Sequence, residues 1–279
     1  MSVKIVTDST AGIPAELRQA LGIEVVPCPI QFGDTTFLDG VDPTAEFYAH
    51  LAQSEAAPTT STPSPGTFLE VYRKAAAEGT TIISIHLMET KSTLVNVARL
   101  AAQMLPDVKI HVVDSRTTTL GLGLLTMAAA RAAQLGRAAG DILAELDRLV
   151  DRVDVYAAIP DLSQLRRSGR VSLGQALVAG VLGIKPILYI GQGVADVVDK
   201  VRGWSKAVER TVEMALERAG GARVALAVVH TNAEAEALRL VESIRDRFDA
   251  VEVMVADAGS AVACHAGPGA VGIATLRLD

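Results

Sequence analysis

The sequence predicts an α/β fold in which a mostly parallel N-terminal sheet with crossover helices is followed by a mixed α/β C-terminal domain. In the first half, short runs of β-branched residues alternate with segments of helical periodicity, which is typical of strands joined by crossover helices. In the second half, Gly191 and Gly193 separate two short apolar runs, and this pattern indicates a hairpin with antiparallel strands. We expect domains over residues 1–152 and 153–279. Because no long linker separates them, we expect the two domains to share a cleft.

In the first half, proline, glycine and polar residues mark where the predicted strands and helices begin and end. Val3–Thr7 is a predicted strand, and Pro14 begins a helix to about Leu21 because proline is tolerated in the first turn. Ile23–Gln31 predicts a second strand, and Gly33 with Asp34 predicts the tight turn of a hairpin. The remaining predictions are helices from Asp42-Pro43 to Leu51, over Ser92–Met104, over Thr119–Leu135 and from Asp141 to near Val153, strands over Thr80–Leu87 and Lys109–Val113, and a polar loop over Ala56–Gly66.

The second half continues with short strands and amphipathic helices. A basic turn over Leu165–Arg170 precedes an apolar helix predicted over about Leu173–Leu182. The predicted strands are Val155–Ile159, Pro186–Ile190, Val194–Arg202, Val224–Thr231, Val251–Ala256 and Gly272–Leu278, and the predicted helices are Lys206–Ala219 and Ala233–Phe248. Because a hairpin stands beside crossover connections, both strand directions are expected in this sheet.

The composition excludes several classes of protein. Hydrophobic residues make up 49% and charged residues 21%, which is too apolar for a disordered chain. The net charge of −6 argues against a nucleic-acid partner, because phosphate binding needs a basic surface. No apolar run approaches the ~20 residues of a membrane span, and the segment MSVKIVTDST lacks the apolar core of a secretory signal. We therefore expect a cytoplasmic protein, by default a monomer, whose Cys28 and Cys264 are reduced core residues.

Two acidic motifs follow predicted strands, at the edge where α/β sheets bind ligands. Asp8-Ser9-Thr10 follows the first strand, and Asp114-Ser115 follows a later one. Each carboxylate has two interpretations: it caps neighbouring backbone amides, or it acts on a ligand.

Hydroxyl groups and one histidine mark three further loops. Thr60 and Ser61 belong to a loop of five hydroxyls and two prolines, which is either an exposed linker or a stiff anion-binding segment. Ser92 stands where a helix begins and is either its cap or a donor to an anion. His265 opens the turn His265-Ala266-Gly267-Pro268-Gly269 and is either structural or functional, whereas His230 is expected to be structural.

Six short motifs stand in a fixed order along the chain. They are Val6-Thr7-Asp8-Ser9-Thr10-Ala11, Thr60-Ser61-Thr62-Pro63-Ser64-Pro65, Val113-Asp114-Ser115-Arg116, Leu165-Arg166-Arg167-Ser168-Gly169-Arg170, Ile184-Lys185-Pro186-Ile187-Leu188 and His265-Ala266-Gly267-Pro268-Gly269. In this order and spacing, the chain resembles the DegV family of bacterial fatty-acid-binding proteins over essentially its whole length.

The resemblance implies a lipid carrier with its site between two α/β domains. The acyl chain of a long-chain fatty acid would lie in an apolar tunnel, and Thr60 and Ser92 match the positions that hold its carboxylate. The resemblance also implies a partner, a fatty acid kinase catalytic subunit that converts the presented carboxylate to an acyl phosphate for phospholipid synthesis. We expect Ser61 and His265 at the ligand, and Arg170 and Arg202 to serve the partner or the phosphoryl transfer. No cofactor or metal is expected.

The chain departs from the family pattern in one loop. The usual Ser-Ser-x-Leu-Ser-Gly-Thr is Met88-Glu89-Thr90-Lys91-Ser92-Thr93-Leu94 here, with Ser92 in register. Glu89 would repel a bound carboxylate unless it points to solvent or pairs with Lys91. The alternative function is a self-contained enzyme for a small polar anion, with His265 and either Asp8 or Asp114 as acid and base. A carrier requires a tunnel lined by aliphatic residues, whereas an enzyme requires titratable groups that converge in a polar pocket.

Overall fold

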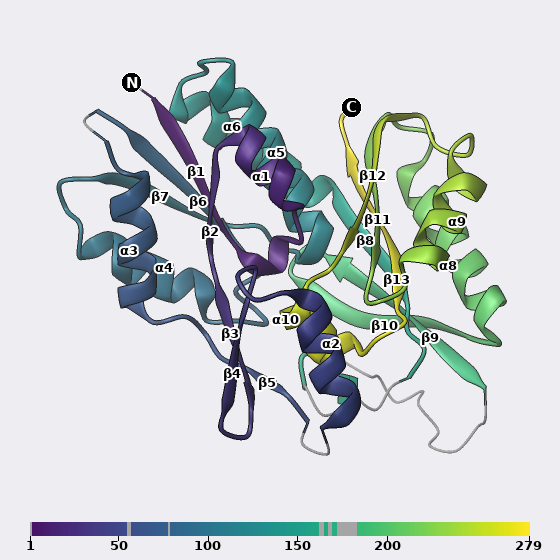
Figure 1. The fold of residues 1–279 in the computed structure, drawn as a ribbon. Coiled ribbons are helices and arrows are strands. Elements are labelled where there is room, and N and C mark those ends of the chain that lie inside the picture. The colour runs from purple at the N-terminus through teal and green to yellow at the C-terminus, as the bar shows by residue number, and fades with distance from the viewer. Residues whose placement is uncertain (1, 55–56, 78, 162–164, 167–168, 172–182) are drawn as a thin grey trace.

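The computed structural model describes residues 2–54, 57–77, 79–161, 165–166, 169–171 and 183–279. In these ranges the chain forms two large sheets side by side and one small sheet below them (Figure 1). The predicted α/β class is confirmed, with a parallel sheet in the first half and a mixed sheet in the second. No helix in the described ranges combines the length and apolar character that a membrane crossing needs. The domain boundary at residues 152 and 153 stays a prediction.

The first sheet is parallel and has the strand order β2-β1-β6-β7. Its strands are β1 (Val3–Asp8), β2 (Ile23–Val26), β6 (Thr81–His86) and β7 (Lys109–Asp114). The helices of this half are α1 (Ala15–Leu21), α2 (Thr44–Gln53), α3 (Pro65–Ala75), α4 (Leu94–Gln103), α5 (Thr119–Gln134) and α6 (Ala139–Leu149), with short 3-10 turns η1 (Ser9–Ala11) and η2 (Val150–Arg152). Parallel pairing requires a crossover between neighbouring strands, which is why the predicted strands and helices alternate.

The second sheet has the order β10-β9-β8-β13-β11-β12, and only β11 and β12 pair in parallel. Its strands are β8 (Val153–Ala158), β9 (Ile184–Gly191), β10 (Val194–Arg202), β11 (Val224–His230), β12 (Ala250–Asp257) and β13 (Val271–Arg277). Helices α8 (Trp204–Ala219) and α9 (Glu234–Ile244) lie on its outer side (Figure 1). The hairpin predicted at Gly191 and Gly193 is confirmed, because it joins the antiparallel strands β9 and β10.

The small sheet corrects two predictions. Its order is β4-β3-β5, with β3 (Cys28–Phe32), β4 (Thr35–Asp39) and β5 (Thr59–Thr60). The single strand predicted over Ile23–Gln31 is wrong, because the chain leaves the first sheet at Pro27, which has no N–H for a ladder. The loop predicted over Ala56–Gly66 is also wrong in part: it contains β5, and α3 begins at Pro65.

The sequence analysis missed two helices. Helix α3 begins after Ser64, whose side chain accepts a hydrogen bond from the Thr67 N–H. Helix α10 spans Ser260–Ala266, so the turn predicted to open at His265 is wrong: His265 lies in the last turn of a helix. Helix α10 has only seven residues and gives little pattern to detect, whereas the spacing of Phe68, Leu69, Tyr72 and Ala75 was an available signal for α3. The apolar helix predicted over residues 173–182 lies outside the described residues, as does part of the predicted basic turn.

Helix α5 joins the two large sheets. Its buried leucines share one apolar core with side chains of β1 and β6 on one side and of β8, β11 and β13 on the other. A Cβ at Gly123 would lie 2.6 Å from the Ala11 carbonyl oxygen, and a Cβ at Gly121 would lie 2.8 Å from Val155 Cγ2. The absence of a side chain therefore lets α5 lie close to Ala11, which follows β1, at Gly123. At Gly121 it lets α5 lie close to β8 of the second sheet.

Candidate binding site

A cavity of about 430 Å³ lies between loops of the first sheet and strands of the second. Small-molecule sites typically have about 300–1,000 Å³ and are mostly apolar with a few polar groups. The same holds here: the described aliphatic residues of the wall include Leu87, Leu94, Leu165, Leu188, Ile190 and Val262. Of the predicted site residues, Thr60, Ser61, Ser92, Arg170 and His265 all line it.

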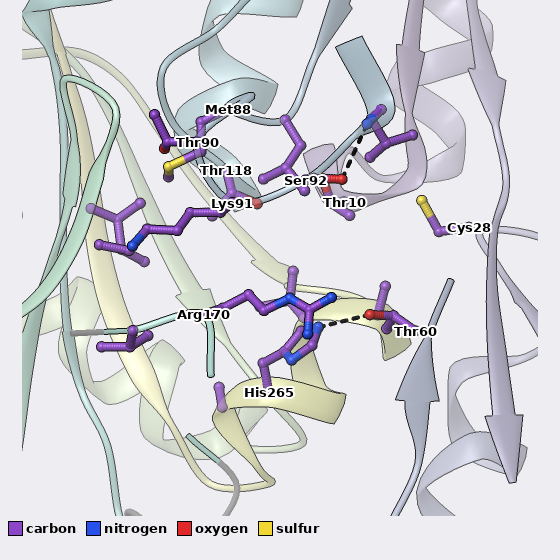
Figure 2. Close-up of a pocket in the computed structure, with 18 of the residues that line it drawn as sticks. Thr10, Cys28, Thr60, Met88, Thr90, Lys91, Ser92, Thr118, Arg170 and His265 are labelled. Carbon is purple, nitrogen blue, oxygen red and sulfur yellow. Dashed lines mark hydrogen bonds between the residues drawn. The ribbon is translucent and has the colours of Figure 1, made fainter. Parts of the chain in front are cut away.

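Thr60 is held at the cavity by the small sheet. Strand β5 pairs antiparallel with β3, with Thr60 opposite Ile30, and the Ser61 N–H donates to the Pro29 carbonyl at 3.0 Å. The Thr60 hydroxyl shares a hydrogen bond of 3.0 Å with His265 Nε2 (Figure 2). The hydroxyl-rich loop is thus a short strand whose position is fixed by its neighbours, which excludes the exposed-linker interpretation for Thr60.

His265 reaches the cavity from helix α10, which is anchored by Asp39. The buried Asp39 carboxylate accepts a hydrogen bond of 2.7 Å from the Ser260 N–H, in the first turn of this helix. Burial, with a smaller contribution from the nearby Arg170, lowers the pKa of His265 to about 4. The ring is therefore neutral at pH 7. Its Nδ1 is buried and has no hydrogen-bond partner in the part of the chain that the structure describes.

Ser92 reaches the cavity from the loop between β6 and α4. Its Oγ accepts a hydrogen bond of 3.3 Å from the Leu94 N–H, but the N-cap of α4 is Thr93, so the prediction of Ser92 as the N-cap is wrong by one position. A serine hydroxyl has one proton and two lone pairs, so this bond leaves the proton for a ligand. The loop is fixed at both sides, because the Met88 N–H donates to the Thr117 carbonyl and the Thr90 hydroxyl donates to the Gly193 carbonyl.

The loop that departs from the family pattern is tied to the Thr60 loop. The hydroxyls of Thr62 and Thr93 lie 2.7 Å apart and share a hydrogen bond. The carboxylate of Glu89 accepts a hydrogen bond of 2.8 Å from Arg99 rather than pairing with Lys91. Glu89 is therefore neutralised by an exposed arginine, and the repulsion considered from the sequence is reduced.

Asp8 belongs to a buried hydrogen-bond network (the Asp8 network) beneath the cavity. Its carboxylate accepts from the backbone N–H and hydroxyl of Thr10, from the Leu87 N–H at 3.0 Å and from His86 Nδ1 at 3.0 Å. Tyr72 donates to Ser84 at 2.9 Å, which leaves the Ser84 proton for His86 Nε2 at 2.6 Å. Asp8 and His86 are fully buried.

The second acidic motif also has a local role. The Asp114 Oδ1 accepts from the N–H groups of Arg116 and Glu89, as a turn cap does, and burial raises the pKa of this carboxyl. Neither Asp8 nor Asp114 is among the described residues that line the cavity. The structure therefore brings neither carboxylate together with His265, as the alternative enzyme would require.

The two predicted arginines lie in different places. Arg170 lines the cavity, and Figure 2 shows its guanidinium beside the ring of His265. Arg202 ends β10, is exposed, and is not among the described lining residues.

The wall of the cavity also contains polar residues that were not predicted as site residues, among them Thr10, Cys28 and Lys91. Thr10 and Cys28 line the cavity beside Ser92 and Thr60, and Lys91 crosses it (Figure 2). Burial, and then the nearby Asp8, raises the pKa of the Cys28 thiol, and burial raises that of Cys264 to about 12. Both cysteines are free and buried, as predicted. The position of Thr10 directly after β1 was the available signal, whereas no sequence pattern places Cys28 near Ser92.

The comparisons with known proteins agree with this architecture. The family model described as an uncharacterised protein of the DegV family matches residues 2–278, and the chain belongs to the DegV family. A DegV domain-containing protein of Streptomyces coelicolor is 35% identical over 273 residues, with 97% of each chain covered.

Two solved structures are similar over the whole fold. One is a fatty-acid-binding DegV family protein from Thermus thermophilus, with a TM-score of 0.92, 31% identity and 100% of each chain covered. The other is DegV, a fatty acid binding protein from Bacillus subtilis, with a TM-score of 0.88, 30% identity and 99% of each chain covered. Both of these relatives are thus described as fatty-acid-binding proteins.

Proposed function

We propose that this protein binds a long-chain fatty acid in the cavity between its two large sheets. One observation carries the proposal: the hydroxyls of Thr60 and Ser92 reach one mainly apolar cavity from separate loops. Burying a methylene contributes about 0.8 kcal/mol, whereas a hydrogen bond to a charged group contributes about 1.5–3 kcal/mol. The acyl chain therefore supplies most of the affinity, and the two hydroxyls set the position of the carboxylate.

Neutral donors suit a carboxylate that has to react later. A bidentate arginine would hold both oxygens in strong charge-assisted bonds, whereas a hydroxyl donates one proton and leaves lone pairs accessible. The neutral His265, like the two hydroxyls, leaves the carboxylate without a charged partner. It shares a hydrogen bond with Thr60 and adds no positive charge to the site.

We test binding with the full chain and two hydroxyl deletions. Native mass spectrometry of the purified protein is expected to show a bound fatty acid. Thr60→Val and Ser92→Ala are each expected to weaken binding of hexadecanoic acid by about 1–3 kcal/mol, because each leaves a carboxylate oxygen without a donor. Thr36→Val, in the exposed strand β4, is the matched control. Uptake of no fatty acid by the unaltered protein, or unchanged affinity in both folded variants, contradicts the proposal.

We further propose that the bound carboxylate is presented to a separate kinase subunit. A carboxylate oxygen attacks the terminal phosphoryl group of a nucleotide held by that partner, the nucleoside diphosphate leaves, and an acyl phosphate forms. His265 and Arg170 lie at the cavity, while the exposed Arg202 is free to contribute to a docking surface elsewhere. The positive side chains of Arg170 and Arg202 favour a nucleotide-loaded partner and neutralise a transferring phosphoryl group, whereas the neutral His265 contributes a hydrogen-bonding group.

The presentation step is tested separately from binding. Alanine variants of Arg170, Arg202 and His265 are expected to keep fatty-acid affinity within about threefold, which is less than 1.4 kcal/mol. They are expected to lower acyl-phosphate formation with the kinase subunit. If binding is lost while the remaining complex reacts normally, the three residues belong to the binding site and the presentation role is wrong.

A further inference from the structure

Lys91 places a second positive group in the cavity, away from the Thr60 end. It lines the cavity and is half-buried, and its side chain extends across the space away from Thr60, Ser92 and His265 (Figure 2). Among the residues that the structure describes, none forms a hydrogen bond or ion pair with its ammonium group. The cavity thus has two polar ends, one formed by hydroxyls and His265 and the other by Lys91.

The backbone of the loop fixes this division. The Lys91 N–H donates to the Met88 carbonyl at 3.2 Å, and the neighbouring Thr90 hydroxyl donates to the Gly193 carbonyl at 2.6 Å. The loop is therefore attached to the turn between β9 and β10. From this fixed backbone, Ser92 points toward Thr10 while Lys91 points to the opposite side (Figure 2). Successive residues thus supply donors to different ends of the cavity.

The described residues around the cavity supply no counter-ion for Lys91. Among the described lining residues, Lys91 and Arg170 are positive and Glu89 is negative. The Glu89 carboxylate is held by Arg99, with both side chains largely exposed. The charge of Arg170 acts at the other end of the cavity, where it contributes to the lowered pKa of His265. A ligand with one carboxylate at Thr60 and Ser92 would leave the ammonium unpaired.

We propose that Lys91 binds a second anionic group of the ligand, so that the site prefers a fatty acid with a carboxylate at both ends. This rests on the proposed function and specifies its substrate class. An acyl chain that fills the cavity removes water from the wall, and an unpaired ammonium in a drier site is costly. A distal carboxylate restores the lost interactions, because a charge-assisted hydrogen bond is stronger than one between neutral groups.

The test compares two ligands of equal chain length with the delipidated full chain. Hexadecanedioic acid and hexadecanoic acid are titrated into the unaltered protein, Lys91→Met and Lys91→Arg. Methionine keeps an unbranched apolar side chain without charge, and arginine keeps the charge. Lys74→Met is the matched control, because Lys74 lies on α3, is 71% exposed in its side chain and pairs with Glu24.

The unaltered protein is expected to bind the diacid more tightly than the monoacid. Lys91→Met is expected to weaken diacid binding about 10- to 100-fold, the size of one charge-assisted hydrogen bond. Monoacid binding should stay equal or improve, Lys91→Arg should keep the preference, and Lys74→Met should change neither ligand.

Three results overturn the inference. If Lys91→Met loses the same affinity for both acids, the ammonium of Lys91 binds the carboxylate that Thr60 also binds. Unchanged affinity for both acids means that the ammonium stays in solvent. If the unaltered protein binds neither acid, the proposed function fails and this inference fails with it. If it binds the monoacid but Lys91→Met leaves diacid binding unchanged, the inference alone is overturned.

Discussion

The Asp8 network and the polar groups of the cavity are neighbours with opposite characters. The carboxylate, imidazole and hydroxyls of the network bond to one another, and Asp8 and His86 are fully buried. In the cavity, the Ser92 proton, the Lys91 ammonium and the Nδ1 of His265 have no partner among the described residues. Buried polar groups in native proteins are nearly always paired, so the unpaired groups of the cavity are available to a ligand.

The two histidines show the same difference within one residue type. His86 has both ring nitrogens hydrogen-bonded, to Asp8 and to Ser84. His265 has one nitrogen bonded to Thr60, the other has no partner among the described residues, and burial lowers its pKa to about 4. The first region therefore stabilises the fold, whereas the second remains able to bind a ligand.

Removal of Asp8 is expected to give the largest loss of stability. Asp8→Ala leaves the Thr10, His86 and Leu87 donors unpaired in the core, and each such group costs about 1–3 kcal/mol. The free energy of unfolding, measured by urea denaturation, should fall by about 3 kcal/mol or more. Asp34→Ala, in the exposed turn of the β3–β4 hairpin, should change it by less than about 0.5 kcal/mol. Equal effects of the two substitutions would show that the network is not structural.

Removal of Ser84 is expected to have a smaller effect of the same kind. Ser84→Ala leaves the Tyr72 hydroxyl and His86 Nε2 without their shared partner, which should lower the free energy of unfolding by about 1–3 kcal/mol. Combining it with Tyr72→Phe should cost less than the sum of the single changes, because the second substitution removes an already unpaired hydroxyl. Strict additivity in the double-mutant cycle contradicts the linked network.

The pH dependence of stability is expected to report His265. The pKa of His265 in the folded protein is about 4 and lies below the ordinary value of 6.5. As the pH is lowered, the imidazole is therefore protonated in the unfolded chain before it is protonated in the folded one. The contribution of the neutral His265 to the free energy of unfolding is fully present above pH 6.5. It is lost as the pH falls from 6.5 toward 4. Urea denaturation at several pH values should show a shallower decline in this window for His265→Asn than for the unaltered protein. Parallel profiles would contradict the lowered pKa.

The smallest effect is expected at Arg99. Arg99→Ala removes an exposed ion pair with Glu89, so the free energy of unfolding should change by no more than about 1 kcal/mol. The freed Glu89 carboxylate adds negative charge at the cavity and should weaken binding of hexadecanoic acid by about two- to threefold, an effect that high salt should reduce. Glu89→Gln in the same background should restore the affinity. A salt-independent change would point to a change in packing.

Much of the fold was predictable because strands and crossover helices leave a strong periodic signal. The strand at Thr80–Leu87 and the helix at Thr119–Leu135 were confirmed almost to their ends as β6 and α5. The helix α10 was missed because it spans seven residues, too few for a clear period. The single strand predicted over Ile23–Gln31 was wrong because its apolar pattern continues across Pro27, where the backbone changes sheets.

The candidate site was predictable residue by residue but not as an arrangement. The motifs pointed to Thr60, Ser92 and His265, and all three line one cavity. The same reasoning left two interpretations open for Asp8, and only the structure shows it bonded to His86, 78 positions away in the chain. Sequence spacing carries no information about contacts at such separation, since they depend on how the sheet orders its strands.

The sequence by itself determined the α/β class, the parallel and mixed halves, the membership of the DegV family and the hydroxyls at the site. These follow from local periodicity and from short motifs, which the chain carries wherever it folds. Only the tertiary structure decided which polar groups satisfy one another and which remain for a ligand. Strand β5 brings Thr60 to His265 across 205 positions, and the attached loop turns Lys91 away from Ser92. Tertiary packing determines which distant polar groups become hydrogen-bond partners, because a hydrogen bond depends on distance and direction in space rather than on order along the chain.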